Sequence, residues 1–182
     1  SFILTPTVLK HFTSGKSGGA VWISHAKTVY VKSSVVLWNK AIMFGGGMYL
    51  DFIDNIVLVN TSFKKNIALY DGAGIYVITV FKGIQIISSN FTNNILTQEN
   101  SSTLLYESTK NEIQQTVNFI CFKSKWVILD NVHIDNSESP GILIKFESKP
   151  NIYFKNLSLT CPVQRILTTV PNYILNTTYQ LY

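Results

Sequence analysis

The hydrophobic residues of this chain form short runs that recur at a nearly fixed spacing. The run Val29-Tyr30-Val31 returns as Ile56-Val57-Leu58 and again as Ile84-Gln85-Ile86, at steps of about 27 residues. Glycine, asparagine, serine and aspartate separate the runs. Short alternating runs of β-branched and aromatic residues bounded by turn residues are typical of β-strands, and no long segment keeps a helical period. The pattern predicts an all-β chain.

Two further motifs recur in the same register. Glycine-rich patches begin at Gly18, Gly45 and Gly72, which are equally spaced along the chain. The other motif covers Val36 to Asn39, Phe63 to Asn66 and Phe91 to Asn94. A repeat of this length marks a solenoid, in which each unit buries its apolar side against its neighbours. We therefore expect a right-handed parallel β-helix of about five coils, with about three short strands per coil.

The alternation of side chains along a strand assigns the two faces. In the first strand of each coil, Trp22, Tyr49 and Tyr76 should point outward as one row. The residues expected to point inward are Val21 and Ile23, Met48 and Leu50, Ile75 and Val77, Val29 and Val31, Ile56 and Leu58, Ile84 and Ile86, and finally Val36, Phe63 and Phe91.

Asparagines and glycines occupy the repeated turns. Asn39, Asn66 and Asn94 share one turn in consecutive coils, and asparagine tolerates left-handed backbone conformations. A ladder of amides between coils explains this recurrence better than a binding site does. The glycine pairs serve tight corners that need a positive φ, and no helix follows them, so they do not predict a nucleotide site.

The repeats indicate one domain over residues 1–182. We expect an N-terminal flank over 1–17, coils over 18–161 with an irregular insertion near 108–125, and a C-terminal flank over 162–182. Leu104-Leu105-Tyr106 should repeat the first strand once more before the insertion.

Composition excludes several classes of protein. With 46% hydrophobic and 14% charged residues, the chain is not disordered. Its longest apolar stretch, Gly74 to Phe81, is too short for a membrane helix, so we expect no membrane insertion. The net charge of +5 comes from scattered lysines, of which only Lys64 and Lys65 are adjacent. Such lysines keep a β-rich surface soluble and do not form the concentrated basic face of a nucleic-acid-binding protein.

Asparagine sequons and cysteines carry information on the cellular compartment in which the protein is made. Five Asn-x-Ser/Thr sequons favour a secreted or cell-surface glycoprotein from a secretory pathway. They begin at Asn60, Asn90, Asn100, Asn156 and Asn176. Cys121 and Cys161 could form one disulfide between neighbouring coils in an oxidising compartment, and two free buried thiols are an equal alternative.

The alternation of a Gly-Gly-Ala-Val patch with a Phe-x-x-Asn patch resembles the repeats of chlamydial polymorphic outer-membrane proteins. The matching residues are Gly18 to Val21, Phe63 to Asn66 and Phe91 to Asn94, with looser matches at Gly45 to Met48, Gly72 to Ile75 and Val36 to Asn39. Together they cover about half of the chain. The resemblance implies a cell-surface or extracellular β-helix that is adhesive or structural and has no catalytic activity.

Candidate catalytic chemistry is sparse. Hydrolysis of a glycosidic bond needs two carboxylates with separate roles. Asp51 and Asp54 flank a turn, where aspartate is expected anyway. His11, His25 and His133 do not have metal-ligand spacing. We therefore expect no enzyme, no cofactor and no metal.

The expected function is a non-enzymatic extracellular or cell-surface module with a structural or adhesive role. It would assemble with itself into a filament or form part of a longer surface protein. One alternative is a polysaccharide lyase or hydrolase of the pectin-lyase-like type. Another is a glycan-binding module that uses Trp22, Tyr49 and Tyr76, although stacked aromatic residues also stabilise a sheet without any ligand.

Overall fold

The computed structural model describes residues 1–97, 119–123, 125–135, 144–146, 151–160, 167–168, 173–175 and 180–181. Their regular structure consists of β-strands. In chain order the strands are β1 (Phe2–Leu4), β2 (Val8–Lys10), β3 (Thr13–Ser14), β4 (Val21–Lys32), β5 (Val35–Leu37), β6 (Lys40–Ala41), β7 (Met48–Val59), β8 (Ser62–Lys64), β9 (Ile67–Ala68), β10 (Ile75–Ile87), β11 (Asn90–Thr92), β12 (Ile95–Leu96), β13 (Phe119–Lys123), β14 (Trp126–Asp130), β15 (His133–Asp135), β16 (Ile144–Phe146), β17 (Asn151–Lys155), β18 (Ser158–Thr160), β19 (Leu167–Thr168), β20 (Tyr173–Leu175) and β21 (Gln180–Leu181).

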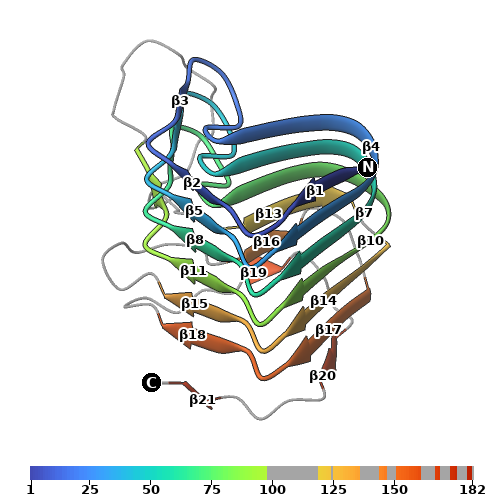
Figure 1. Cartoon of the computed structure of the whole chain (residues 1–182). Coiled ribbons are helices and arrows are strands. Elements are labelled where there is room, and N and C mark those ends of the chain that lie inside the picture. Colours follow the sequence, from blue (N-terminus) through green and yellow to red (C-terminus); the bar gives the residue numbers. More distant parts are fainter. Residues whose placement is uncertain are drawn as a thin grey trace, which may run out of the picture.

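The strands wind through three parallel sheets. The first sheet follows the order β1-β4-β7-β10-β13-β16-β19, with β14, β17 and β20 continuing it alongside. The second is β2-β5-β8-β11-β15-β18-β21, and the third is β3-β6-β9-β12. Each named strand pair is parallel. Figure 1 shows the resulting stack of coils, from blue at the N-terminal end to red at the C-terminal end.

This architecture confirms the predicted parallel β-helix. Four strands form the third sheet and seven form the second, so four coils have all three sides and the stack continues in two sheets. The expected number of about five coils lies between these two values.

Strand register explains the repeat length. Val29, Val31 and their neighbours in β4 pair with the residues one repeat later in β7, such as Ile56 and Leu58. Between β7 and β10 the register shifts at a bulge between Val80 and Gly83. The bulge inserts one extra residue into β10, and this is why the second step of the sequence repeat is longer than the first.

In the coils of β4, β7 and β10, the first two predicted strands form one long strand with a bend, whereas later coils keep two separate strands such as β13 and β14. β4 and β7 each contain 12 residues and β10 contains 13. The bend lies at His25 in β4 and at Phe52 in β7, whose φ angles are +59° and +50°. Residues with such left-handed backbones turn the chain sharply without ending the hydrogen-bonded ladder.

The interior is filled by columns of like side chains, as predicted. Met48, Leu50, Ile75 and Val77 are fully buried, as are the inward residues of the second and third runs. Phe63 and Phe91 stack with ring centroids 5.1 Å apart. Val21 and Ile23 belong to the same columns but are only partly buried, because they lie in the first complete coil.

Both expected flanks contain coil strands. In the range 1–17, β1, β2 and β3 pair with β4, β5 and β6. In the range 162–182, β19, β20 and β21 pair with β16, β17 and β18. The solenoid therefore extends into both segments, because their short apolar runs continue the ladders even though the glycine motif is missing from them.

A later strand lies beside the first half of β10, at the position that we expected Leu104-Leu105-Tyr106 to take. β13 occupies the position beside the first half of β10, with Phe119 opposite Ile75 and Cys121 opposite Val77. Leu104 to Tyr106 lie outside the described residues, and so does most of the predicted insertion at 108–125. Part of that insertion, Phe119–Lys123, is thus a regular rung of the β-helix.

Candidate functional site

The buried asparagine column is the most ordered polar feature of the molecule. The backbone N–H and side-chain Nδ2 of Asn39 both donate to Oδ1 of Asn66, at 3.1 and 3.0 Å. The same two groups of Asn66 donate to Oδ1 of Asn94, at 3.0 and 2.9 Å. All three side chains are fully buried. The predicted amide ladder is therefore confirmed, and the amides contact neighbouring coils instead of solvent.

Carbonyl groups complete this ladder. Nδ2 of each asparagine also donates to a carbonyl oxygen of the preceding coil, in Leu9, Val36 and Phe63 respectively. At the N-terminal end, the backbone N–H of Phe12 donates to Oδ1 of Asn39 at 3.0 Å. Because buried amides that lack partners are costly, this complete bonding accounts for the asparagines structurally.

The glycine corners combine two constraints. Gly18, Gly45 and Gly72 have φ angles of +70°, +67° and +59°, as predicted for tight corners. Gly46 has no positive φ, but a Cβ atom there would lie 2.4 Å from the carbonyl oxygen of Ile67. The coils approach each other so closely at this corner that a side chain has no room.

The outer aromatic row Trp22, Tyr49 and Tyr76 is formed as predicted. Ring centroids are 6.3 Å apart between Trp22 and Tyr49 and 5.5 Å apart between Tyr49 and Tyr76, with interplanar angles of 9° and 10°. Exposure decreases along the row, from 61% at Trp22 to 7% at Tyr76. Phe44 covers Tyr76, with ring centroids 4.6 Å apart.

This stacking determines what the row can bind. A sugar ring packs on the face of an aromatic ring, and in this row the faces of Tyr49 and Tyr76 lie against other aromatic rings. Trp22 has a ring neighbour from the row only on the Tyr49 side. The row is thus a stacked column with one available face at its N-terminal end, and not an extended platform.

Asp51 lies beside this row. Burial raises the pKa of the Tyr49 phenol above its usual 10.0, and the negative charge of Asp51 raises it further. Oδ1 of Asp51 is buried without a hydrogen-bond partner. The polar groups next to the aromatic row are therefore poorly solvated.

A second outer aromatic column lies at the bend of the long strands and was not predicted. His25 and Phe52 stack with ring centroids 4.8 Å apart, and Phe52 and Phe81 follow at 6.4 Å. Phe52 and Phe81 are 43% and 47% exposed. Oγ of Ser24 lies 2.6 Å from Nδ1 of His25. The signal available in the sequence was that His25 and Phe52 are one repeat apart, but the bend at these residues interrupts the alternation from which faces were assigned.

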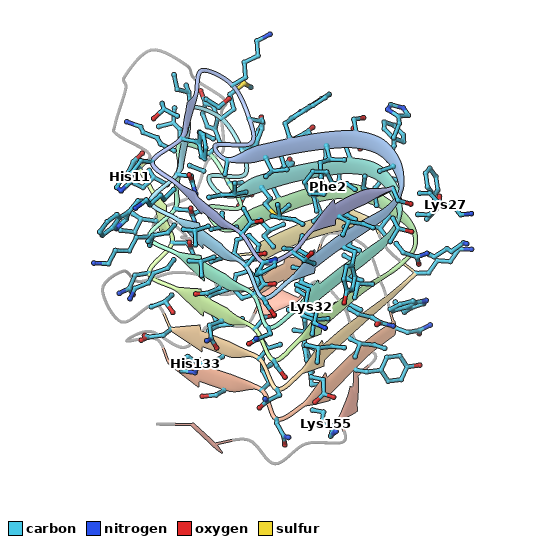
Figure 2. All side chains as sticks on the ribbon, viewed as in Figure 1. Phe2, His11, Lys27, Lys32, His133 and Lys155 are labelled. Atoms are coloured by element: carbon cyan, nitrogen blue, oxygen red, sulfur yellow. The ribbon has the colours of Figure 1, made fainter. Side chains whose placement is uncertain are left out.

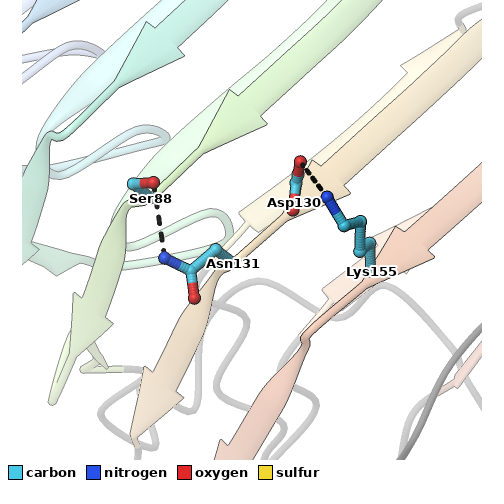
Figure 3. Close-up of polar contacts among 4 residues, drawn as sticks. All are labelled: Ser88, Asp130, Asn131 and Lys155. Carbon is cyan, nitrogen blue, oxygen red and sulfur yellow. Dashed lines mark hydrogen bonds and ion pairs between the residues drawn. The ribbon is translucent and has the colours of Figure 1, made fainter.

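The remaining polar contacts on the outside are dispersed. Figure 2 shows His11 and His133 on the side of the molecule opposite Lys27, at different levels of the stack. Nδ1 of His133 lies 3.1 Å from Oγ of Ser158. Figure 3 shows two exposed contacts between coils: Nδ2 of Asn131 donates to Oγ of Ser88 at 3.4 Å, and Lys155 pairs with Asp130 at 3.5 Å.

Candidate metal ligands do not gather in the part of the chain that the structure describes. Within it, no three histidine, cysteine, aspartate or glutamate side chains lie close enough to hold a metal ion. Asp51 and Asp54 lie on either side of Phe52, the bend residue of β7.

The predicted glycosylation sites occupy two kinds of position. Asn60, Asn90 and Asn156 are exposed. Asn60 and Asn156 have φ angles of +52° and +50° and belong to a corner column of left-handed residues that also includes Ser33, Ser88 and Asn131. The corner gives asparagine a backbone role at these two positions besides any role as a sequon. Asn100 and Asn176 lie outside the described residues.

Only one of the two cysteines of the predicted disulfide lies among the described residues. Cys121 lies in β13, opposite Val77 of the inward-facing column. Cys161 lies outside the described residues, so the pairing of these two cysteines remains a prediction.

A search of known proteins finds no family model, curated protein or solved structure that matches this chain. Among the described residues, no helix is long and apolar enough to cross a membrane.

Proposed function

We propose that the protein is a non-enzymatic extracellular or cell-surface β-helix module with a structural or adhesive role. It is glycosylated and assembles end to end into a filament, or forms one stretch of a longer surface protein. The observation that carries this proposal is the continuous stack of parallel strands with columns of aromatic side chains on its outer surface. Among the described residues, the three sheet orders begin with β1, β2 and β3.

The direction of the strands supports end-to-end assembly. All described strand pairs are parallel, so the strands at both ends of the stack run the same way round the coil. Open strand edges recruit further strands, and contacts between unlike ends that do not close into a ring produce filaments. A second copy can therefore extend the stack in the same sense.

The outer surface also supports a structural or adhesive role. Its aromatic residues stack in columns along the coils, while the described titratable groups form isolated contacts such as Lys155 with Asp130. Exposed aromatic residues such as Trp22 and Phe81 favour contact with other molecules.

Sedimentation velocity and electron microscopy of the purified chain test the proposed assembly. We expect the sedimentation coefficient to rise with protein concentration and the particles to form rods. Ile3→Lys should reduce assembly, since Ile3 is 68% exposed in the end strand β1 and lysine on an edge strand opposes pairing. The matched control is Val57→Lys in the same outer column but two coils further in. Monodisperse single stacks at all concentrations would contradict the proposal.

Two further measurements test compartment and catalysis. Intact mass before and after enzymatic deglycosylation should differ if the chain is produced in its secretory pathway, and non-reducing conditions would report any disulfide.

Incubation with acidic polysaccharides should release no unsaturated or reducing ends. Release of such ends would overturn the non-enzymatic assignment in favour of a polysaccharide lyase or hydrolase.

The exposure of Trp22 favours glycan binding as a second candidate function. Its 61% exposed indole is the one ring of the predicted row with an available face. Trp22→Ala should then abolish retention on an immobilised glycan, whereas Tyr76→Phe should leave retention unchanged because Tyr76 is covered by Phe44.

A further inference from the structure

The corner between the second and third sheets brings together lysines that are far apart in the sequence. Lys10 of β2 pairs with Leu37 of β5, and Leu37 pairs with Lys64 of β8, so the two lysines lie two strands apart. Neighbouring strands are about 4.8 Å apart, which puts the Cα atoms of these lysines about 10 Å from each other. The repeat therefore concentrates charge that is scattered along the chain.

The turn after these strands adds further basic residues. His11, Trp38 and Lys65 occupy equivalent positions in this turn, with left-handed φ angles of +61°, +53° and +52°. Backbone hydrogen bonds join the turns of successive coils, and the N–H of Trp38 donates to the carbonyl of Lys64 at 3.0 Å. Lys40 follows Trp38 by two residues and begins β6. We call six residues of this surface the basic corner: Lys10, His11, Trp38, Lys40, Lys64 and Lys65.

The four lysines of the basic corner are not neutralised by described carboxylates. Lys10, Lys40 and Lys64 are exposed, and Lys65 is partly exposed. Within the described part of the chain, no carboxylate forms an ion pair with any of the four. The aspartates lie in β7, beside Gly72, in β14 and in β15, and they are Asp51, Asp54, Asp71, Asp130 and Asp135. The positive charges of the corner are therefore available to an anion.

Trp38 adds an aromatic surface among these charges. Its side chain is 48% exposed. The ring of His11 contacts it with centroids 5.0 Å apart and an interplanar angle of 42°. Because the two rings are tilted and not parallel, the imidazole leaves much of the indole face open. The basic corner thus offers both ammonium groups and a flat apolar surface.

We propose that the basic corner binds an acidic polysaccharide, a glycan chain that carries sulfate or carboxylate groups. The lysines would pair with the acidic groups, while a sugar ring would pack on the open face of Trp38. This inference rests on the proposed adhesive role and deepens it by naming the class of ligand. The site is separate from Trp22, which belongs to β4 of the first sheet.

The composition of the corner favours a glycan over a nucleic acid. Proteins that bind phosphate chains commonly use the forked guanidinium group of arginine, and the cations of the basic corner are lysines and one histidine. Single-stranded nucleic acids stack successive bases on a series of aromatic side chains. The corner has one tryptophan with a tilted imidazole beside it, which suits one ring of a chain whose other contacts are ionic.

A heparin oligosaccharide of defined length, which is densely sulfated, serves as the probe in calorimetric titration of the full-length chain. The double variant Lys64→Gln and Lys65→Gln should weaken binding by about tenfold, because it removes two adjacent charges of the corner. Binding of the unchanged protein should weaken as the salt concentration rises. A neutral dextran of similar length should not bind.

A matched double variant controls for net charge. Lys27→Gln and Lys82→Gln remove the same charge from exposed lysines of β4 and β10, and Figure 2 shows Lys27 on the side of the molecule opposite His11. Heparin binding should then change by less than about twofold, because salt screens charges at that distance. Circular dichroism establishes that each variant keeps its β-sheet signal.

Trp38→Asn tests the aromatic contact separately. Asparagine tolerates the left-handed backbone of this position, so the turn is kept while the ring is removed. Heparin binding should weaken by about threefold or more. Unchanged binding would remove the tryptophan from the site.

Three outcomes would overturn this inference: no binding of heparin, equal losses in the two double lysine variants, or tighter binding of single-stranded DNA than of heparin. Sedimentation without any glycan separates the inference from the proposed assembly. A chain that forms filaments but does not bind heparin would retain the structural role and reject the basic corner as a site. A monomeric chain that binds heparin through Lys64 and Lys65 would do the reverse.

Discussion

Two columns of side chains repeat with the same spacing along the chain but differ in the interactions that stabilise them. The inner column of Asn39, Asn66 and Asn94 is fully buried, and every link in it is a hydrogen bond of 2.9 to 3.1 Å. The outer row of Trp22, Tyr49 and Tyr76 changes from 61% to 7% exposure over three coils. Repetition in sequence therefore does not imply repetition of environment.

The difference arises from where each column meets its neighbours. Inside the coil, each asparagine bonds to groups above and below it, so that a replacement leaves buried polar groups without partners. On the outside, a side chain is buried only if another segment covers it, as Phe44 covers Tyr76. We expect substitutions in the inner column to lower stability strongly. In the outer row, we expect the effect on stability to depend on the coil in which the residue lies.

Asn66→Ala tests the inner column most directly. The side chain of Asn66 accepts two hydrogen bonds from Asn39 and donates one each to Val36 and Asn94. Its removal should lower the free energy of unfolding by about 4 kcal/mol, because several buried polar groups lose their partners. Urea denaturation followed by circular dichroism measures this change.

Asn60→Gly is the control for removing an asparagine side chain. Asn60 is exposed, its one side-chain contact is a 3.5 Å bond to Ser33, and glycine keeps its positive φ. The change should stay within about 0.5 kcal/mol. A comparable loss in both variants would contradict the contrast between buried and exposed asparagines.

Gly46→Ala tests the close approach of the coils at the glycine corner. A Cβ atom at this position would lie 2.4 Å from the carbonyl oxygen of Ile67 and 2.5 Å from that of Ala73. The coils must separate to accommodate it, so we expect a loss of about 3 kcal/mol in thermal or urea unfolding. Gly15→Ala is the control, because nothing lies within 4 Å of its added Cβ. Equal stability of the two variants would show that the corner is less tightly packed.

The interior could be predicted from the sequence because two simple periods determine it. Alternation along a strand and a repeat of nearly fixed length together place Val36, Phe63 and Phe91 in one column, and the structure confirms it. The asparagine ladder followed from the same repeat. Neither prediction required any knowledge of how the strands connect outside the repeats.

The features that escaped prediction break one of these periods. His25 and Phe52 adopt a left-handed backbone in the middle of a strand, a conformation that residues other than glycine uncommonly show, so their column was not recognised. Burial of Tyr76 depends on Phe44, which precedes the glycine corner and carries no repeat signal. The rung at Phe119–Lys123 lacks a glycine patch and follows a gap of a different length.

Two substitutions within the aromatic row sharpen the comparison between covered and open positions. Tyr76→Ala should cost about 2 to 3 kcal/mol, because it removes a buried ring packed between Tyr49 and Phe44. Trp22→Ala should cost about 1 kcal/mol or less, since its ring has one stacking neighbour and is mostly exposed. Denaturation of both variants under the same conditions gives the two losses in free energy of unfolding, which can then be compared. A larger effect at Trp22 than at Tyr76 would reverse the gradient that the structure predicts.

Titration of Tyr49 gives the smallest effect and tests the middle of the row. Burial raises the pKa of this phenol above 10.0, and the Asp51 carboxylate raises it further. A raised pKa means that the folded chain holds the proton more tightly than the unfolded chain does. The associated stability is therefore present below pH 10 and is lost as the pH rises through the pKa of the folded state.

Absorbance of tyrosinate against pH, compared between the native chain and Tyr49→Phe, isolates this group among the nine tyrosines. The difference should show an ionisation above pH 10, and Asp51→Asn should move it part of the way down, because burial remains after the charge is removed. An ionisation at or below pH 10 would contradict the burial of the Tyr49 phenol. The gradient of burial along the outer row would then begin only at Tyr76, where Phe44 provides the cover.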